Sequence, residues 1–238
     1  AVKQSIEDLF ESFLGITEYA NVYSVDFRIM FTKDIYNTVL QDDPEYARRK
    51  NIETAYGLYY ISRTGEQWLI IKENNNYVEV LHNLFHELIH IYDFNKLVLC
   101  MNESDIRKLQ DNIFFVLWSE FHAEYYSYKY LVQLGKDNIN PTQVVSEFQK
   151  KLKDFMSKQS RIEVQDVADF CVRQYGQYLA LYDCFMEDVS KYPSHFFVNE
   201  KFLALYDYLC EHKTFESIKR NIGELENIFK SLEPHGDA

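Results

Sequence analysis

Apolar positions along the chain follow first a helical and then an alternating period. Between residues 2 and 14 they recur every three or four positions and a glycine follows, which predicts an amphipathic helix. From Val25 to Phe31 apolar residues alternate with mostly polar ones, as in a half-buried strand. Two further apolar runs, 56–62 and 67–72, flank a four-residue link that contains Gly65. They predict a β-hairpin, because glycine adopts the positive φ that such links need.

Two long helices are expected to follow the hairpin. Residues 77–99 are apolar over a wide arc, so this helix is expected to be central and buried. After capping side chains at 102–104, a second helix is expected from about Asp105 to Leu134, where Gly135 stops it.

The remainder of the chain shows only helical periodicity. It opens on Asn140-Pro141, which supplies a cap and a first-turn proline, and it contains three or four helical patterns and no strand. The sequence therefore predicts an α+β fold, with a small antiparallel sheet and two long helices in residues 1–138. An all-helical extension is expected in residues 139–238.

Composition narrows the classes of protein. Only 7 glycines and 4 prolines among 238 residues disfavour an all-β sandwich or barrel, which needs frequent turns. The formal net charge is −12 and the longest basic run is Arg48-Arg49-Lys50, so nucleic-acid binding is not expected. There is no uncharged apolar stretch of membrane-spanning length, and the first twenty residues carry four acidic side chains where a signal peptide is apolar.

The four cysteines form no CxxC pair and are sparse for this length. They fit free thiols in a reducing compartment better than a disulfide framework. We therefore expect a cytoplasmic protein.

The most specific motif is His86-Glu87-Leu88-Ile89-His90, which has HExxH spacing. Two histidines four residues apart lie on one face of a helix, so both imidazoles can reach one ion, and the intervening glutamate can act on water. The composition of this chain yields the motif roughly 0.02 times by chance. Its position in an apolar helix after a hairpin is typical of a zinc peptidase.

Catalytic zinc usually takes three protein ligands, so a third must lie elsewhere. The second long helix offers Glu120 and Glu124 within its apolar stripe, where an ionised carboxylate needs a proton, a cationic partner or a metal. If the two long helices are antiparallel neighbours, these glutamates fall within about one helical turn of the HExxH segment. The stripe consists of Ile106, Leu109, Ile113, Val116, Glu120, Glu124, Ser127 and Leu131.

We assign His86, His90 and Glu120 as zinc ligands and Glu87 as the general base. Glu124 is placed to accept a hydrogen bond from the far nitrogen of a ligand histidine. Two alternatives stay open, because Glu124 is a rival for the third ligand position and Glu120 can instead be a buried salt-bridge partner of a lysine or arginine.

The two motifs together resemble the gluzincin class of metallopeptidases, and most closely the ImmA/IrrE type. The resemblance covers about residues 55–134, and it implies a zincin-like core and intracellular, site-specific proteolysis of a regulatory protein, commonly a repressor. Three departures are Glu124 for Asn or Asp, Tyr126 for Phe and Ser127 for Ala. The residues that match or replace the second motif of that family are Glu120, Ala123, Glu124, Tyr126, Ser127, Tyr130 and Leu131.

Other candidates carry less specific signals. His82 precedes His86 by one turn and is expected to be partly exposed, and His122 is expected to face away from Glu120. The strand at 68–72 is a candidate sheet edge for binding an extended peptide substrate. Two alternatives to a peptidase are a zinc-stabilised binding or regulatory protein that does not cut its partner, and a helical interaction module with an accidental motif.

Overall fold

A computed structural model describes residues 4–20, 25–49, 52–74, 76–101, 110, 112–158, 164–192 and 200–232. The chain divides into two compact units, Ala1–Asp111 and Asn112–Ala238. This division falls before the second long helix, whereas the predicted domain boundary lies after it, near residue 138. Among the described residues, no helix combines the length and the apolar character that crossing a membrane requires.

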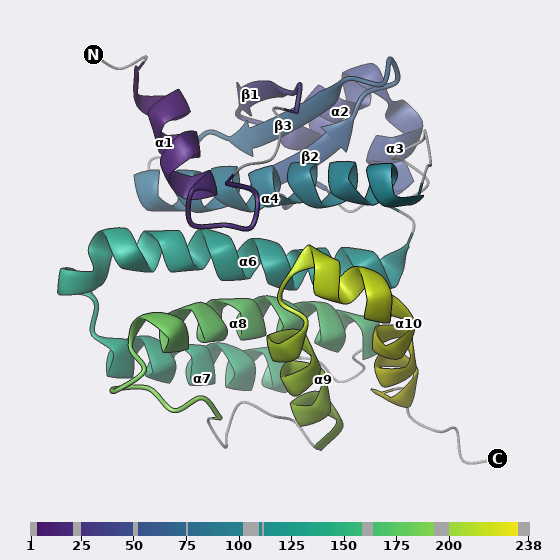
Figure 1. Cartoon of the computed structure of the whole chain (residues 1–238). Helices are drawn as coiled ribbons and strands as arrows, with labels where there is room; N and C mark the ends of the chain where they lie inside the picture. The colour runs from purple at the N-terminus through teal and green to yellow at the C-terminus, as the bar shows by residue number, and fades with distance from the viewer. Residues whose placement is uncertain are drawn as a thin grey trace. The chain divides into compact units, whose positions relative to one another are not determined.

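The first unit contains a three-stranded sheet in the order β1-β3-β2 (Figure 1). β2 (Gly57–Ile61) and β3 (Gln67–Lys72) form the predicted antiparallel hairpin, and Gly65 has a φ of 86° in the link. β1 (Arg28–Thr32) pairs with β3 in parallel, so the sheet is mixed and the prediction of a wholly antiparallel sheet is wrong. A parallel pair needs a crossover connection, and here that connection contains two helices as well as β2.

Strand order also corrects the expected peptide-binding edge. β3 lies between β1 and β2, so both of its edges are used within the sheet and residues 68–72 offer none to a peptide. β2 is an outer strand of this sheet. The apolar pattern of β3 does not reveal the position of this strand in the sheet, because such a pattern indicates which face is buried and not which strands are paired.

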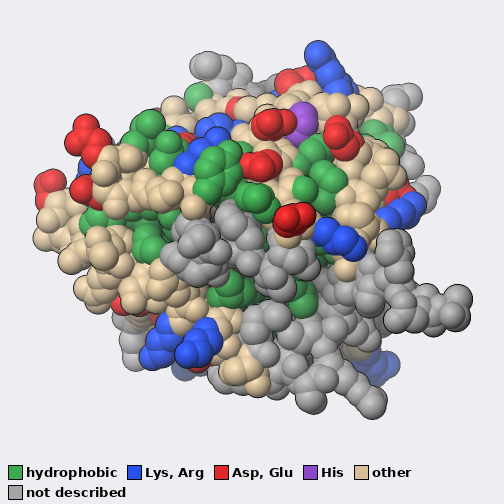
Figure 2. All heavy atoms as spheres, turned by 90° about the horizontal axis from the view of Figure 1, so that it is seen from below, with side chains coloured by type: hydrophobic (Ala, Val, Ile, Leu, Met, Phe, Trp, Pro, Cys, Tyr) green, Lys and Arg blue, Asp and Glu red, His purple; other side chains and the backbone are tan. Residues whose placement is uncertain are grey.

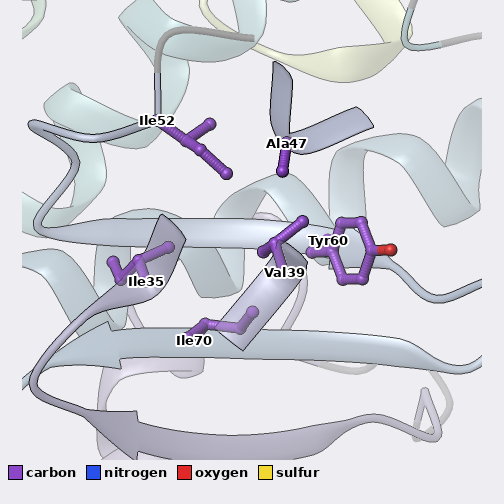
Figure 3. Close-up of a cluster of buried hydrophobic side chains, with 6 residues drawn as sticks. All are labelled: Ile35, Val39, Ala47, Ile52, Tyr60 and Ile70. Carbon is purple, nitrogen blue, oxygen red and sulfur yellow. The ribbon is translucent and has the colours of Figure 1, made fainter. Parts of the chain in front are cut away.

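Two short helices that the sequence analysis missed, α2 (Ile35–Asp42) and α3 (Pro44–Arg49), cover one face of the sheet. The side chain of Asp34 caps α2 by accepting a hydrogen bond from the Asn37 amide. Figure 3 shows apolar side chains of these helices meeting those of the strands. This buried cluster consists of Ile35, Val39, Ala47, Ile52, Tyr60 and Ile70.

The opposite face of the sheet is covered by α4 (Tyr77–Met101), the predicted central helix. Strand residues alternate between the two faces, so Tyr60 points to the α2 side and Tyr59 to the α4 side, where its ring lies 5.9 Å from that of Phe94. The predicted N-terminal helix, α1 (Gln4–Leu14), is confirmed. Phe13 in its last turn stacks on Phe85 of α4, with the ring centres 4.5 Å apart. α4 is thus held between the sheet and α1.

The described residues of the second unit form helices joined by turns and include no strand, as predicted. Its helices are α6 (Ile113–Gly135), a short 3-10 turn (Lys136–Asn138), α7 (Pro141–Lys158), α8 (Val164–Cys184), α9 (Glu200–Glu211) and α10 (Phe215–Leu232). The Asn140 side chain accepts a hydrogen bond from the Gln143 amide, which confirms the predicted cap of α7.

The start of the second long helix is later than predicted. α6 begins at Ile113, and Asn112 caps it by accepting from the Phe115 amide at 3.1 Å, so a continuous helix from Asp105 is wrong. The predicted break at 102–104 lies outside the described residues. Asn112 therefore has the capping role that we predicted for residues 102–104.

α6 and α8 make the most extensive packing in the second unit. A Cβ added at Gly176 of α8 would lie 2.5 Å from the Phe121 carbonyl oxygen and 2.9 Å from the Tyr125 amide nitrogen, both backbone atoms of α6. Only glycine therefore permits this approach. It occurs at the turn of α6 that carries Glu120 and Glu124.

Charges are mixed on the face of the molecule in Figure 2. Acidic side chains lie there among hydrophobic ones, and the Lys and Arg side chains visible among its described residues are scattered rather than gathered into a patch. The expectation that the chain does not bind nucleic acid stays a prediction.

Candidate metal centre

The two histidines of the HExxH motif lie on adjacent turns of α4 with their ring nitrogens facing each other. His86 Nε2 and His90 Nε2 are 3.1 Å apart, and the ring planes are inclined by 80°. Both side chains are buried, with 5% and 7% of their surface exposed. The predicted placement of the two imidazoles on one helix face is confirmed.

This distance fits a shared metal ion. Two ligands of a tetrahedral zinc ion with bonds of about 2.0–2.1 Å lie about 3.3 Å apart, close to the observed separation of the Nε2 atoms. Without a cation, two ring nitrogens at this distance require one ring to carry a proton and donate it to the other. The pair therefore suits either a bound cation or a single shared proton.

Glu87 turns toward the sheet rather than along the helix. Its Oε2 accepts a hydrogen bond of 2.7 Å from the backbone amide of Tyr59 on the outer strand β2. At Gly57 an added Cβ would lie 2.9 Å from both Cγ and Oε1 of Glu87, so the missing side chain at this position makes room for the carboxylate. The strand thereby fixes the orientation of the glutamate.

A buried carboxylate that the sequence analysis missed follows the motif. Asp93 is three residues beyond His90 on α4 and is fully buried, and its Oδ1 accepts a hydrogen bond from the hydroxyl of Tyr19. Tyr19 also stacks on Tyr92 at 5.2 Å, and Lys96 lies over its ring while pairing with Glu18. The segment after α1 is therefore fastened to α4 immediately beyond the second histidine.

Glu120 on α6 has the cationic partner that the alternative to metal binding requires. Its Oε2 lies 2.8 Å from Nη1 of Arg173 on α8, and 14% of the Glu120 side chain is exposed. Burial lowers the pKa of Arg173, but the carboxylates of Glu120, Asp169 and Glu124 outweigh this effect and hold the pKa above its ordinary value. Arg173 therefore stays charged.

Glu124 is held by the same helix. Its Oε2 accepts a hydrogen bond of 2.7 Å from the side-chain amide of Gln177. Arg173 and Gln177 are four residues apart on α8, and Gly176 between them contacts α6 directly. One face of α8 thus orients both carboxylates.

Buried or half-buried histidine and glutamate side chains of the kind that could hold a metal ion occur in both units. Within the first unit the structure brings His86 and His90 together. Within the second, Glu120 on α6 contacts Arg173 of α8, and Glu124 contacts Gln177 of the same helix. The predicted meeting of the histidine pair with Glu120 on one ion stays a prediction.

Two further histidines, His82 and His122, were expected to lie outside the ligand set. His82 is partly exposed, as expected, and its ring centre lies 6.0 Å from that of His86. His122 is fully buried and stacks on Trp118 with the ring centres 4.5 Å apart. It thus belongs to the aromatic packing of the second unit.

Comparisons with protein-family models, with curated proteins and with solved structures gave no match to this chain. The likeness to gluzincin peptidases therefore rests on the motif residues alone.

Sequence reasoning missed the groups that orient the candidate site. These groups are Gly57, the Tyr59 amide, Arg173 and Gln177. Each lies far along the chain from the residue that it contacts, so no spacing rule links the two. The one available signal was Arg173 itself, a charged residue inside a helix with many apolar positions.

Replacing Gly176 by Ala tests the close approach of α8 to α6. The new methyl group meets backbone atoms that cannot rotate away, so we expect the free energy of unfolding to fall by about 1–3 kcal/mol. Gly223→Ala in α10 is the matched control, because no neighbouring atom lies within 4 Å and alanine favours the helix by about 0.5–1 kcal/mol. Urea unfolding measures both, and equal effects would contradict the packing described above.

Proposed function

We propose that this chain is a zinc-dependent peptidase with a zincin-like core, in which His86, His90 and Glu120 bind the ion. The observation that carries the proposal is the 3.1 Å separation of the two histidine Nε2 atoms within an HExxH motif. The buried carboxylate between them in sequence, Glu87, is held against an outer strand. These features support a reactive centre more than a chance motif on a solvated helix.

Each unit supplies part of the proposed ligand set. The first contributes two imidazoles already at the spacing of neighbouring ligands, and the second contributes Glu120. Arg173 contacts Glu120 through Oε2, and we assign the other oxygen, Oε1, to the ion. Two neutral imidazoles and one carboxylate match the ligand sets of catalytic zinc sites, which keep a further position open.

Zinc, when bound, supplies a Lewis acid that lowers the pKa of water to about 7 and polarises the scissile carbonyl. Glu87 takes the proton from the attacking water and later delivers it to the leaving amine. The Tyr59 amide holds Oε2 of Glu87, so the proton transfers are assigned to Oε1. No covalent intermediate with the protein forms in this mechanism.

The proposed substrate is an extended peptide. β2 is an outer strand, and its Tyr59 amide already contacts Glu87, so a peptide paired with this strand would present its backbone beside the general base. By resemblance to the ImmA/IrrE type, we propose site-specific cleavage of an intracellular regulatory protein.

A second candidate is a regulatory or binding protein that does not cut its partner. The ion pair between Glu120 and Arg173 favours it, because this pair neutralises the carboxylate without a metal. The two candidates differ in whether zinc binding depends on Glu120 and whether the chain hydrolyses peptides at all.

Metal retention tests the ligand assignment. Glu120→Ala removes a proposed ligand and is expected to weaken zinc binding more than about 100-fold, whereas Glu124→Ala removes only support and is expected to cost about 10-fold. Chelator competition on the purified full-length variants measures both. The reverse order would exchange the roles of the two glutamates.

Glu87→Gln tests the proposed chemistry. The amide keeps the shape of the side chain but cannot take a proton, so we expect one zinc per chain and no cleavage of a defined peptide library by mass spectrometry. Glu79→Gln is the matched control, because this exposed glutamate lies in the first turn of the same helix and undergoes the same chemical change, and it should keep the products of the parent protein. Cleavage by Glu87→Gln at the parental rate would rule out the mechanism.

A further inference from the structure

We propose that α8 is an integral part of the metal site, with Arg173 as a positioning residue for the zinc ligand Glu120. This inference rests on the proposed function and extends it, because it gives the helical second unit a role in metal binding. Arg173 and Glu120 lie on α8 and α6, which both belong to the second unit.

The contact between Arg173 and Glu120 is direct and has a fixed orientation. Nη1 of Arg173 lies 2.8 Å from Oε2 of Glu120, and Nε of the same guanidinium donates to Asp169 at 3.1 Å. A planar guanidinium bound at two edges by two carboxylates has little freedom to rotate. Glu120 is thereby held in one rotamer before any ion binds.

Charge makes this arrangement useful for metal binding. A metal ligand must be ionised, and a mostly buried carboxylate pays a desolvation cost for its charge. Arg173 offsets that cost through one oxygen of Glu120. The second oxygen can then serve as a ligand without a change of side-chain conformation, and this lowers the cost of ordering the site.

Packing fixes the distance between the two helices at the same turn. Gly176 lets the α8 backbone approach α6 at Phe121 and Tyr125, and Gln177 binds Glu124 from the same face of α8. The chain therefore holds both candidate carboxylates by one helix at a single close crossing.

The experiment measures the affinity of the full-length chain for Zn²⁺ alone, by chelator competition. Arg173→Gln is expected to bind zinc 10- to 100-fold more weakly than the parent, as is usual when a group that orients a ligand is removed. Arg173→Lys keeps the charge but not the planar fork, so its loss should be smaller. Arg220→Gln, at an exposed arginine of α10, is the matched control and should bind as the parent does.

A double-variant comparison identifies the route of the effect. In the Glu120→Gln background, replacement of Arg173 should change zinc affinity less than about twofold, because the group through which it acts is already altered. Thermal unfolding of the metal-free proteins shows whether each variant is folded. If Arg173→Gln does not fold, Arg173→Lys carries the test.

The outcomes separate the two proposals. If the parent binds zinc and the folded Arg173 variants bind it equally well, the positioning role is overturned and the peptidase proposal stands. An equal loss in both backgrounds also overturns it, because Arg173 would then act independently of Glu120. If the parent binds no stoichiometric zinc, the proposed function fails, and the positioning role fails with it.

Discussion

The close approach of two imidazole nitrogens on one buried helix is the constraint on which the proposed chemistry depends. At 3.1 Å, His86 and His90 must share either a proton or a cation. α4 cannot readily relieve this by bending, because the sheet covers one side of it and α1 packs through Phe13. The buried Asp93 and its partner Tyr19 fasten the next turn.

A similar constraint acts in the second unit. There the absence of a side chain at Gly176 brings α8 against α6, and the crossing places Arg173 and Gln177 on the two glutamates. Each unit therefore holds its own polar groups in fixed orientations by local packing. Such preorganisation is what a metal site needs, because ligands that are ordered before binding lower the cost of capturing the ion.

The elements predicted best were those with a long, regular pattern or a specific turn residue. The hairpin around Gly65, the HExxH helix and the helical second half follow from periodicity and from one positive φ. α2 and α3 were missed because helices of 8 and 6 residues are too short to show a period. The parallel pairing of β1, and the partners Gly57 and Arg173, depend on contacts between distant segments, on which local spacing carries no information.

X-ray absorption at the zinc edge of the purified full-length chain tests the central claim most directly. The account predicts one zinc per chain, with only nitrogen and oxygen neighbours at about 2.0–2.2 Å and the outer-shell scattering of two imidazole rings. A protein that takes up no zinc would contradict it. So would a zinc ion with sulfur neighbours at about 2.3 Å, because cysteines would then hold it instead of His86 and His90.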